Sequence, residues 1–302
     1  MNKQIQINQL PAPTWRWIKG NQVQLPWGEE TAFCLTQIDN ICTITPAQGT
    51  YSHGQLVYTA QAGTTMTVLQ CIGADKAAQG LRLHTHLQVE QGATLQLVQV
   101  FHGGAPCNMV NQVKANCAES GKVEVLQILA NQGDLYSDVT IDLDGDNSDY
   151  SMVTGYIAQQ QVLDMNLLVN HKGCQTTSNI QFEGVIQEKG YKTFRGTIDI
   201  QEGASGADGS EHENVVLLGE DIRNLTIPVI LCHQEDVHGA HGASISQLDE
   251  EVLFYLNSRG IGREQAEQMI LRAKLECVVN HVQAPELKDK IHQVLKEVLA
   301  ND

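Results

Sequence analysis

The amino-acid sequence predicts a mainly β protein with a small α-helical segment at its C-terminal end, and three observations support this fold class. Gly accounts for 26 of 302 residues and aromatic residues for only 5%, which suits short strands and tight turns better than a helical bundle. From residue 31 to about 245, apolar or β-branched residues recur at every second position between glycines. From about residue 246 the apolar spacing changes to the helical period.

Composition and charge exclude several classes of partner. The formal net charge is −16 and the pI is about 5.0, so a basic surface for nucleic acid is not expected. No run approaches the roughly 18 apolar residues that a membrane-spanning helix needs. The N-terminal stretch lacks the apolar segment of a signal peptide, so we expect a cytoplasmic protein with no membrane contact. Its eight cysteines are then expected to be reduced, and none forms a C-x-x-C pair.

Residues 1–30 differ from the rest of the chain in composition. They contain all three tryptophans (Trp15, Trp17 and Trp27) and three of the seven prolines. We expect an irregular N-terminal leader that packs against the body of the protein and carries no catalytic group.

The predicted β body occupies residues 31–245. Alternating segments predict strands at 122–130, 138–145, 149–158, 162–173, 178–190 and 191–203. Glycines separate them at short intervals, and no helical pattern intervenes. Closely spaced strands of this kind fit a sandwich, a barrel or a β-solenoid, and their periodicity does not choose among the three.

The helical segment occupies residues 246–302. A first helix is predicted at 248–260, ending at Gly260, and a second at 263–282 with Ala266, Met269, Ile270, Ala273 and Cys277 on one face. A third helix is predicted at 285–299, where Pro285 suits the first helical position. The change of period therefore marks a domain boundary.

A cluster of potential metal ligands lies just before this boundary, in "ILCHQEDVHGAHGAS" at residues 230–244. Its ligand-type side chains are Cys232, His233, Glu235, Asp236, His238 and His241. Thiolate and imidazole groups suit Zn(II), Fe(II) or an iron–sulfur species better than Mg or Ca. In a strand, Cys232 and His233 would face opposite ways, so a shared site needs a bend, which the following glycines permit. The alternative interpretation is a polar surface loop.

A second candidate site is "LHTHLQVEQ", with His84, His86 and Glu90, followed by His102. The H-x-H spacing places two imidazoles on one strand face, and the downstream glutamate is similar to the metal-binding set of cupins. This favours, as an alternative function, a metal-dependent cupin-like β-fold enzyme. The second cupin motif is missing, and the competing interpretation is two outward-facing histidines.

Other motifs indicate little chemistry. Lys192 and Arg195 lie near a predicted turn, where isolated cations on strands are expected to be solvated. The chain has no G-x-x-x-x-G-K-[ST] motif and should not bind ATP through a P-loop.

Two longer stretches resemble the SufB/SufD family of iron–sulfur cluster assembly proteins. The first is "SNIQFEGVIQEKGYKTFRGTIDIQEGASGADGSEHENVVLLGEDI" and the second is "IPVILCHQEDVHGAHGASISQLDEEVLFYLNSRGIGREQAEQMILRA". The turn D-V-x-x-x-H-G-A-[ST], followed by L-D-E-E-x-L-F-Y-L-x-S-R-G-I, is highly specific to that family. The similarity covers about residues 165–275 and is typical of a compact SufD-like or SufB-like member.

The resemblance implies a right-handed parallel β-helix core and a non-enzymatic scaffold function. In this family two such subunits pair through their β-helices, and each docks an ABC-type ATPase, SufC, on its C-terminal helices. We therefore expect pairing with a second copy or with a SufB-like partner. A SufC-type ATPase and a sulfur donor protein are further expected partners. The expected cargo is a transient iron–sulfur cluster, and the chain needs no nucleotide of its own.

The resemblance also implies site residues. His241 matches the family histidine implicated in cluster assembly at the subunit interface, and Gly242 stands where SufB has a glutamate. The SufB cysteine falls near Glu213, so that thiol is missing, and we infer that Cys232 could replace it. The cluster or metal candidates are therefore His241, Cys232, His238 and Asp236. The candidates for ATPase docking are Leu248, Asp249, Glu250, Leu253, Phe254, Tyr255 and Arg259.

Overall fold

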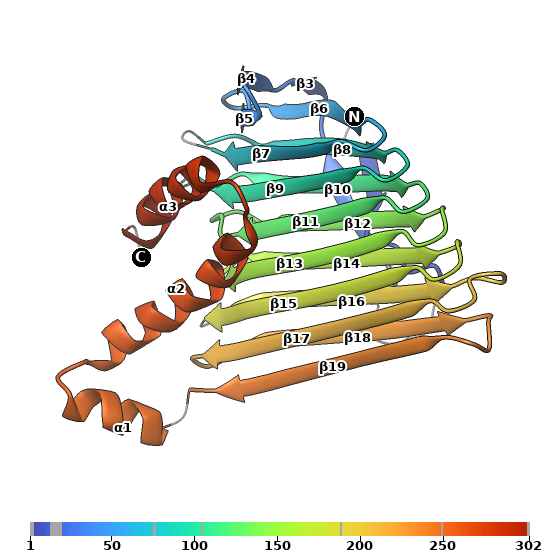
Figure 1. The fold of residues 1–302 in the computed structure, drawn as a ribbon. Coiled ribbons are helices and arrows are strands. Elements are labelled where there is room, and N and C mark those ends of the chain that lie inside the picture. The colour runs from blue at the N-terminus through green and yellow to red at the C-terminus, as the bar shows by residue number, and fades with distance from the viewer. Residues whose placement is uncertain are drawn as a thin grey trace.

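The computed structural model of the chain is a parallel β-solenoid with a helical arm along one side (Figure 1). It describes residues 3–12, 20–74, 77–103, 105–187, 189–248 and 250–300. The strands are β1 (Lys3–Ile7), β2 (Val23–Trp27), β3 (Glu30–Ala32), β4 (Cys34–Ile38), β5 (Ile41–Thr45), β6 (Tyr51–Ala60), β7 (Thr65–Gly73), β8 (Gly80–Val89), β9 (Thr94–His102), β10 (Asn108–Cys117), β11 (Lys122–Leu129), β12 (Leu135–Leu143), β13 (Asp149–Ala158), β14 (Val162–His171), β15 (Thr177–Gln187), β16 (Tyr191–Ile200), β17 (Asp208–Leu218), β18 (Arg223–Cys232) and β19 (His238–Gln247).

Successive strands alternate between two facing sheets. The even sheet contains β3 and the even-numbered strands from β6 to β18. The odd sheet contains β4 and the odd-numbered strands from β5 to β19. Apart from the antiparallel pair β4–β5, neighbouring strands within both sheets are parallel. The solenoid therefore settles the choice that the alternating pattern left open, and the predicted mainly β class is confirmed. The strands expected from residue 122 to 203 are β11 to β16.

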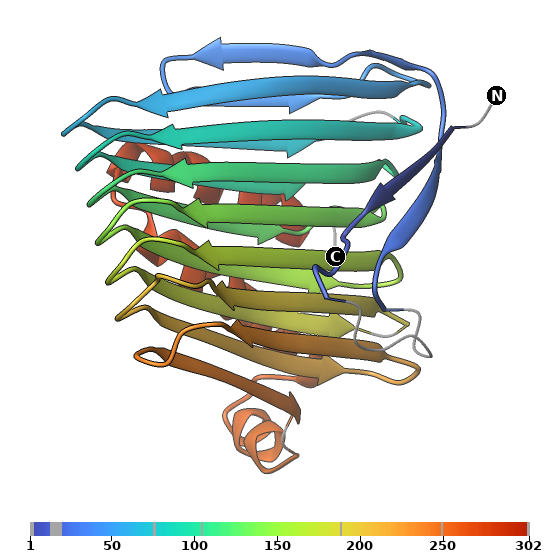
Figure 2. The same cartoon turned by 90° about the vertical axis from the view of Figure 1, so that its right-hand side faces the viewer.

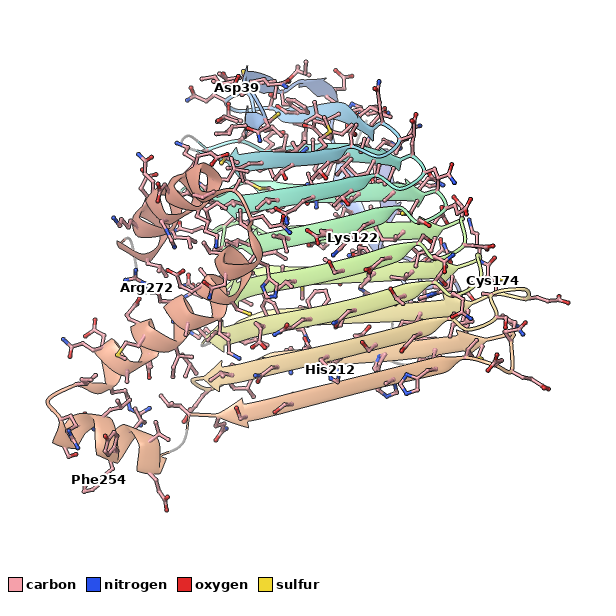
Figure 3. The ribbon with its side chains drawn as sticks, viewed as in Figure 1. Asp39, Lys122, Cys174, His212, Phe254 and Arg272 are labelled. Carbon is pink, nitrogen blue, oxygen red and sulfur yellow. The ribbon has the colours of Figure 1, made fainter. Side chains whose placement is uncertain are left out.

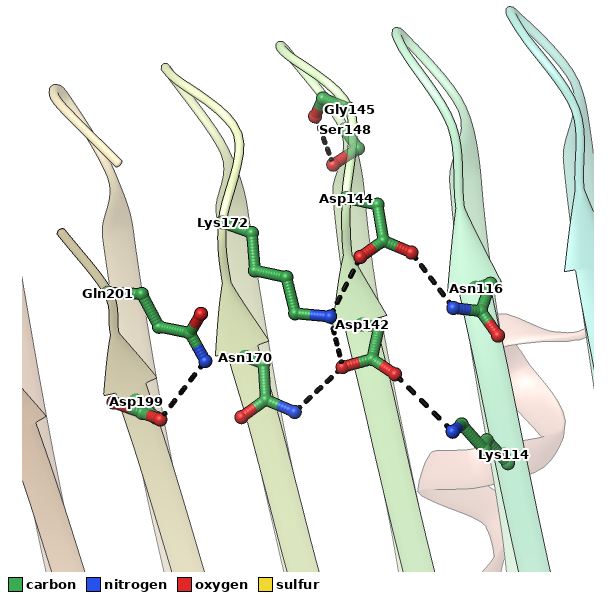
Figure 4. Close-up of polar contacts among 10 residues, drawn as sticks. All are labelled: Lys114, Asn116, Asp142, Asp144, Gly145, Ser148, Asn170, Lys172, Asp199 and Gln201. Carbon is green, nitrogen blue, oxygen red and sulfur yellow. Dashed lines mark hydrogen bonds and ion pairs between the residues drawn. The ribbon is translucent and has the colours of Figure 1, made fainter. Parts of the chain in front are cut away.

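Polar ladders on the outer face of the even sheet tie neighbouring turns together (Figure 4). Asp144 accepts bonds from Asn116 and Lys172, both at 2.8 Å, and these partners lie 28 residues before and after it. Asp142 likewise binds Asn170 and Lys172 at 2.8 Å. Because each partner comes from an adjacent turn, the ladders favour one register of stacking.

Between the sheets, a single apolar core runs the length of the solenoid. Its middle holds a buried amide ladder: Gln99 donates to Gln70 at 2.7 Å, and Gln127 donates to Gln99 at 2.8 Å. Asn111 joins it from the opposite sheet, donating to Gln99 at 2.9 Å. Such fully buried amides are tolerated because their hydrogen-bonding groups meet one another.

The N-terminal leader is not irregular in its described part, so that expectation is wrong there. β1 and β2 form an antiparallel pair, and Figure 2 shows them crossing the outer face of the even sheet. Ile5, Ile7 and Trp27 pack there on Val110 and Tyr136. The sequence does carry a signal for β1, the alternation of apolar and polar residues in "KQIQI". The composition of residues 1–30 does not reveal it. Trp15 and Trp17 lie outside the described residues.

The helical arm covers the outer face of the odd sheet. It consists of α1 (Glu250–Ser258), α2 (Arg263–His281) and α3 (Pro285–Ala300), and Pro285 begins α3 as expected. α2 lies against β11, β13 and β15, and α3 lies against β9. The predicted face of α2 is confirmed in part: Ala266 is buried, and Ile270 and Cys277 pack partly buried against the sheet, whereas Met269 and Ala273 are exposed. The fully buried residues that the prediction missed are Leu271, Leu275, Val278 and Val279. These residues pack on buried valines and leucines of the outer face of the odd sheet, which the sequence of the helix does not reveal.

Candidate functional site

The C-terminal end of the solenoid, formed by β18 and β19 and called here the open end, is where the predicted cluster lies. Each of these strands has a hydrogen-bonded neighbour on one side only within the described residues. Their remaining backbone groups are therefore available to another chain. Ile245 of β19 is 52% exposed, although its register partner on β17, Val215, is in the core.

The predicted ligands separate to different places on this end. Cys232 is the last residue of β18, is exposed, and donates its thiol to the Gln234 carbonyl at 3.1 Å. Asp236 lies in the following turn near the Ser205 hydroxyl, at 3.5 Å. His238 begins β19, and its Nδ1 lies 3.0 Å from an Asp208 carboxylate oxygen.

His241 belongs to the inward-facing column of side chains. It pairs in register with Glu211, whose side chain is buried between the sheets, and paired residues on parallel strands face the same way. Because β19 is the last strand, His241 nevertheless remains exposed to solvent. Cys232 is also exposed and faces inward, because its register partner on β16, Ile200, is a core residue.

Cys232 and His241 are not brought together. A Cβ on Gly239 would lie 3.4 Å from Ile230, so these two residues face each other across the interior. Cys232 lies two residues beyond Ile230 toward the turn, and His241 lies two residues beyond Gly239 away from it. At about 3.3 Å per residue, their offset along the strands is roughly 13 Å. One mononuclear site cannot therefore include both side chains in this conformation.

A buried polar cluster that the sequence did not predict lies just inside the open end. The Lys192 ammonium group lies 2.5 Å from Glu213, with side-chain exposures of 0% and 1%. Tyr156 donates to Glu213 at 3.0 Å and Thr226 donates to it at 2.6 Å. Lys192 also donates to Asn224 at 2.9 Å. The expectation that Lys192 is solvated is thus wrong.

Arg195 is equally buried, at 2% exposure, so its expected solvation is wrong as well. It pairs with Asp164 at 2.6 Å on the outer face of the even sheet, beneath the leader. For Lys192 a sequence signal existed: it alternates with the core residues Phe194 and Ile198 of the same strand. A cation in register with core residues is a buried cation and requires a buried partner.

Glu211 is a second buried carboxyl group of the cluster, at 3% exposure. Burial, aided by the neighbouring charge of Glu213 and opposed by Lys192, raises the pKa of Glu211 to about 8. Gly196 on the facing strand makes room, since a Cβ there would lie 1.8 Å from a Glu211 oxygen.

The predicted docking residues occupy α1 and its flanks. Phe254 is 77% exposed and Tyr255 is 56% exposed, and Figure 3 shows Phe254 at the outer end of the arm. Leu253 faces inward at 2% exposure, Leu248 is partly buried against the arm's core, and Arg259 stacks over the Tyr255 ring at 5.2 Å. Glu250 begins α1, and Asp249 lies outside the described residues.

The alternative metal site does not assemble. His84 and His86 lie on β8 in the even sheet, whereas His102 lies on β9 in the odd sheet. Glu90 accepts the Ala62 amide at 2.9 Å in a turn. Burial and the nearby Arg82 charge lower the pKa of His84 to about 4. In the described part of the chain, no three His, Cys, Asp or Glu side chains gather as a metal site, and no helix is long and apolar enough to cross a membrane.

The fold is thus a parallel β-solenoid with unpaired edge strands at one end and exposed aromatic side chains on its helical arm, within the described residues. Residues 43–274 match the family profile described as "SUF system FeS cluster assembly, SufBD core domain". The chain belongs to this family.

Curated relatives agree with this assignment. The chain is 30% identical to the iron–sulfur cluster assembly protein SufD of Bacillus subtilis over 188 residues, which are 62% of this chain and 43% of that protein. It is 31% identical to SufD of Escherichia coli over 115 residues, 38% of this chain and 27% of that protein. A SufBD family protein of Mycobacterium bovis is 25% identical over 222 residues, 71% and 49% respectively. The matches thus span less than half of each relative.

Proposed function

We propose that this chain is a scaffold subunit of a cytoplasmic SUF-type iron–sulfur cluster assembly complex. It pairs through the open end with a second β-solenoid, either another copy or a SufB-like partner. It docks a SufC-type ABC ATPase through α1, and the ATPase rather than this chain hydrolyses the nucleotide. A separate sulfur donor protein supplies sulfur. The observation that carries the proposal is the match of residues 43–274 to the SufBD core, combined with the unpaired strands of the open end.

The open end supports pairing on physical grounds. β18 and β19 present free backbone donors and acceptors at the edges of both sheets. An incoming strand can satisfy these groups and at the same time cover Ile245, which is 52% exposed.

His241 is the residue we propose for contact with the nascent cluster, because it faces inward, is exposed to solvent and pairs in register with Glu211 of the buried polar cluster. Iron–sulfur clusters usually take four protein ligands, so one imidazole needs further ligands from a partner or from free thiols. Because this chain offers too few ligands, we propose that the cluster is shared between the two subunits at their interface. Glu213 cannot supply the missing thiol, and it is already engaged with Lys192. Cys232, His238 and Asp236 remain candidates only for a site nearer the turn.

The docking surface is supported by the exposure of Phe254 and Tyr255, which no described packing explains. Exposed aromatic side chains on a helix are typical anchors of protein interfaces, where truncating one commonly costs 2 kcal/mol or more. Leu253 instead holds α1 in place and should not be altered in a binding test.

The test is co-purification of the full chain with the SufC-type ATPase of the same organism. The double variant Phe254→Ala/Tyr255→Ala should bind at least tenfold more weakly. Ile38→Ala, which removes a 67% exposed side chain from β4 at the opposite end, should bind like the wild type. No capture of the ATPase by the folded wild-type chain would refute the docking. Robust nucleotidase activity of the pure chain would refute the scaffold function.

A further inference from the structure

The described leader, residues 3–12 and 20–27 and called here the strap, is anchored by apolar contacts at one end. Ile5, Ile7 and Trp27 pack on Val110 of β10 and Tyr136 of β12. These contacts fix the strap to the middle of the even sheet, several strands away from the open end.

Its other end is held by a buried polar network. The Asn8 amide donates to the Asp164 carboxylate at 2.5 Å and to the Asp164 carbonyl at 3.0 Å. Arg195 binds the same carboxylate through two nitrogens, at 2.6 and 3.2 Å, and its Nε donates to the Gly20 carbonyl. The side chains are buried, with Asn8 at 0%, Asp164 at 3% and Arg195 at 2% exposure. Charged hydrogen bonds shielded from water in this way are the strong ones.

From this network the strap reaches the last strand of the even sheet. Arg195 on β16 pairs in register with Ile227 on β18. Gly20 packs directly on that side chain, since a Cβ on Gly20 would lie 2.8 Å from Ile227 Cδ1. Ile227 is the single fully buried residue of β18, at 3% exposure.

We propose that the strap is a clamp for the open end: it holds β18 against β16, so that its docking sets how readily the last turn of the solenoid opens. Among the described strands, β18 has no neighbour on its far side, and its one buried outer side chain is the one the strap covers. Loosening the strap therefore frees the edge strand without disturbing the remote turns. The inference concerns the isolated chain and does not depend on the proposed pairing.

The test is native-state hydrogen exchange of the full chain, read strand by strand. Asn8→Gly removes the amide that holds Asp164, and glycine tolerates the positive φ of 53° at this position. Gly20→Val inserts a branched side chain against Ile227 and lifts the strap by a different route. Gln24→Ala, an exposed position on the same strap, is the matched control.

Both anchoring variants should speed exchange of the protected amides of residues 223–232 at least tenfold, with the amides of β9 and β11 within twofold of the wild type. The control should change neither. Unchanged exchange in β18 would overturn the clamp, as would an equal acceleration in all strands, which would make the strap a general stabiliser. The exchange rates test the clamp independently of the proposed pairing, so a failure to pair in a separate binding experiment would not change their interpretation.

Discussion

At the scale of single residues, the buried charges of Lys192 and Glu213 near the open end compensate each other. Both side chains are removed from water, and Tyr156 and Thr226 complete the hydrogen bonding of the carboxylate. A buried ion pair stabilises a fold little more than apolar residues of the same size would. Removing one partner is costly, however, because the other charge then stays buried without compensation.

Lys192→Met should therefore destabilise the fold by about 3–5 kcal/mol, because it leaves Glu213 buried without its cation. The free energy of unfolding from urea titration at pH 7 measures this. The double variant Lys192→Met/Glu213→Gln should recover part of the loss, since it removes the stranded charge. A cost below about 1 kcal/mol for the single variant would mean that water reaches this cluster.

Glu211 predicts a dependence of stability on pH. Its pKa rises from 4.5 to about 8 on folding, because burial disfavours the carboxylate. The folded state thus holds the proton more tightly than the unfolded state. This contribution to stability is fully present below pH 4.5 and is lost as the pH rises to about 8.

Glu211→Gln keeps the side chain neutral at every pH and should remove this dependence. Between pH 4.5 and 8 the wild type should lose a few kcal/mol of unfolding free energy relative to the variant. The loss corresponds to about 1.4 kcal/mol for each unit by which the pKa is raised. Chemical denaturation at several pH values gives the two curves. Parallel curves over that range would show that Glu211 is ionised in the folded protein.

At the scale of elements, two glycines on inner positions of the odd sheet should respond differently to alanine. On β15, a Cβ at Gly184 would lie 1.9 Å from the Tyr156 ring, which passes over this residue to reach Glu213. On β19, a Cβ at Gly239 would make ordinary contacts of 3.4 and 3.5 Å with Ile230.

Gly184→Ala should therefore lower the thermal midpoint by about 2–5 °C, for an overpacking cost of roughly 1–3 kcal/mol. Gly239→Ala should change it little, and serves as the control. Thermal unfolding followed by circular dichroism compares them. Equal midpoints would mean that Tyr156 does not cross β15.

The strands were predictable from sequence because each carries its own alternating pattern, as in 149–158 and 191–203. The solenoid was not, because stacking depends on relations between turns. The spacing of 28 residues that joins Asn116, Asp144 and Lys172 is such a relation, and it is visible in the sequence once sought. The family resemblance supplied what the local pattern lacked.

The candidate site was predictable only in part for the same reason. Proximity in sequence grouped Cys232 with His241, whereas the register places Glu211 beside His241. The separation of Cys232 follows from the turn at 233–237, which sends the two residues in opposite directions along facing strands.

At the scale of the whole molecule, the helical arm is part of the fold as well as a candidate docking element. The outer face of the odd sheet is apolar, and the arm covers it with Leu271, Leu275, Val278 and Ile291. On the sheet side, the buried residues include Leu69, Val98, Val100, Leu126, Ile128, Val153 and Val185. Removing the arm would uncover this surface along several strands, which soluble proteins seldom tolerate.

A chain ending after Gln247 should therefore aggregate or bind a hydrophobic dye such as ANS, even though every strand of the solenoid is retained. Size-exclusion chromatography and dye fluorescence test this, with Phe254→Ala/Tyr255→Ala as the control that keeps the arm and should elute like the wild type. Loss of ATPase capture by the truncated chain would then reflect a damaged body as much as a missing contact, which is why the point variants are the proper docking test. A monodisperse truncated chain without dye binding would instead show that the solenoid is stable alone and that the arm serves its partners only.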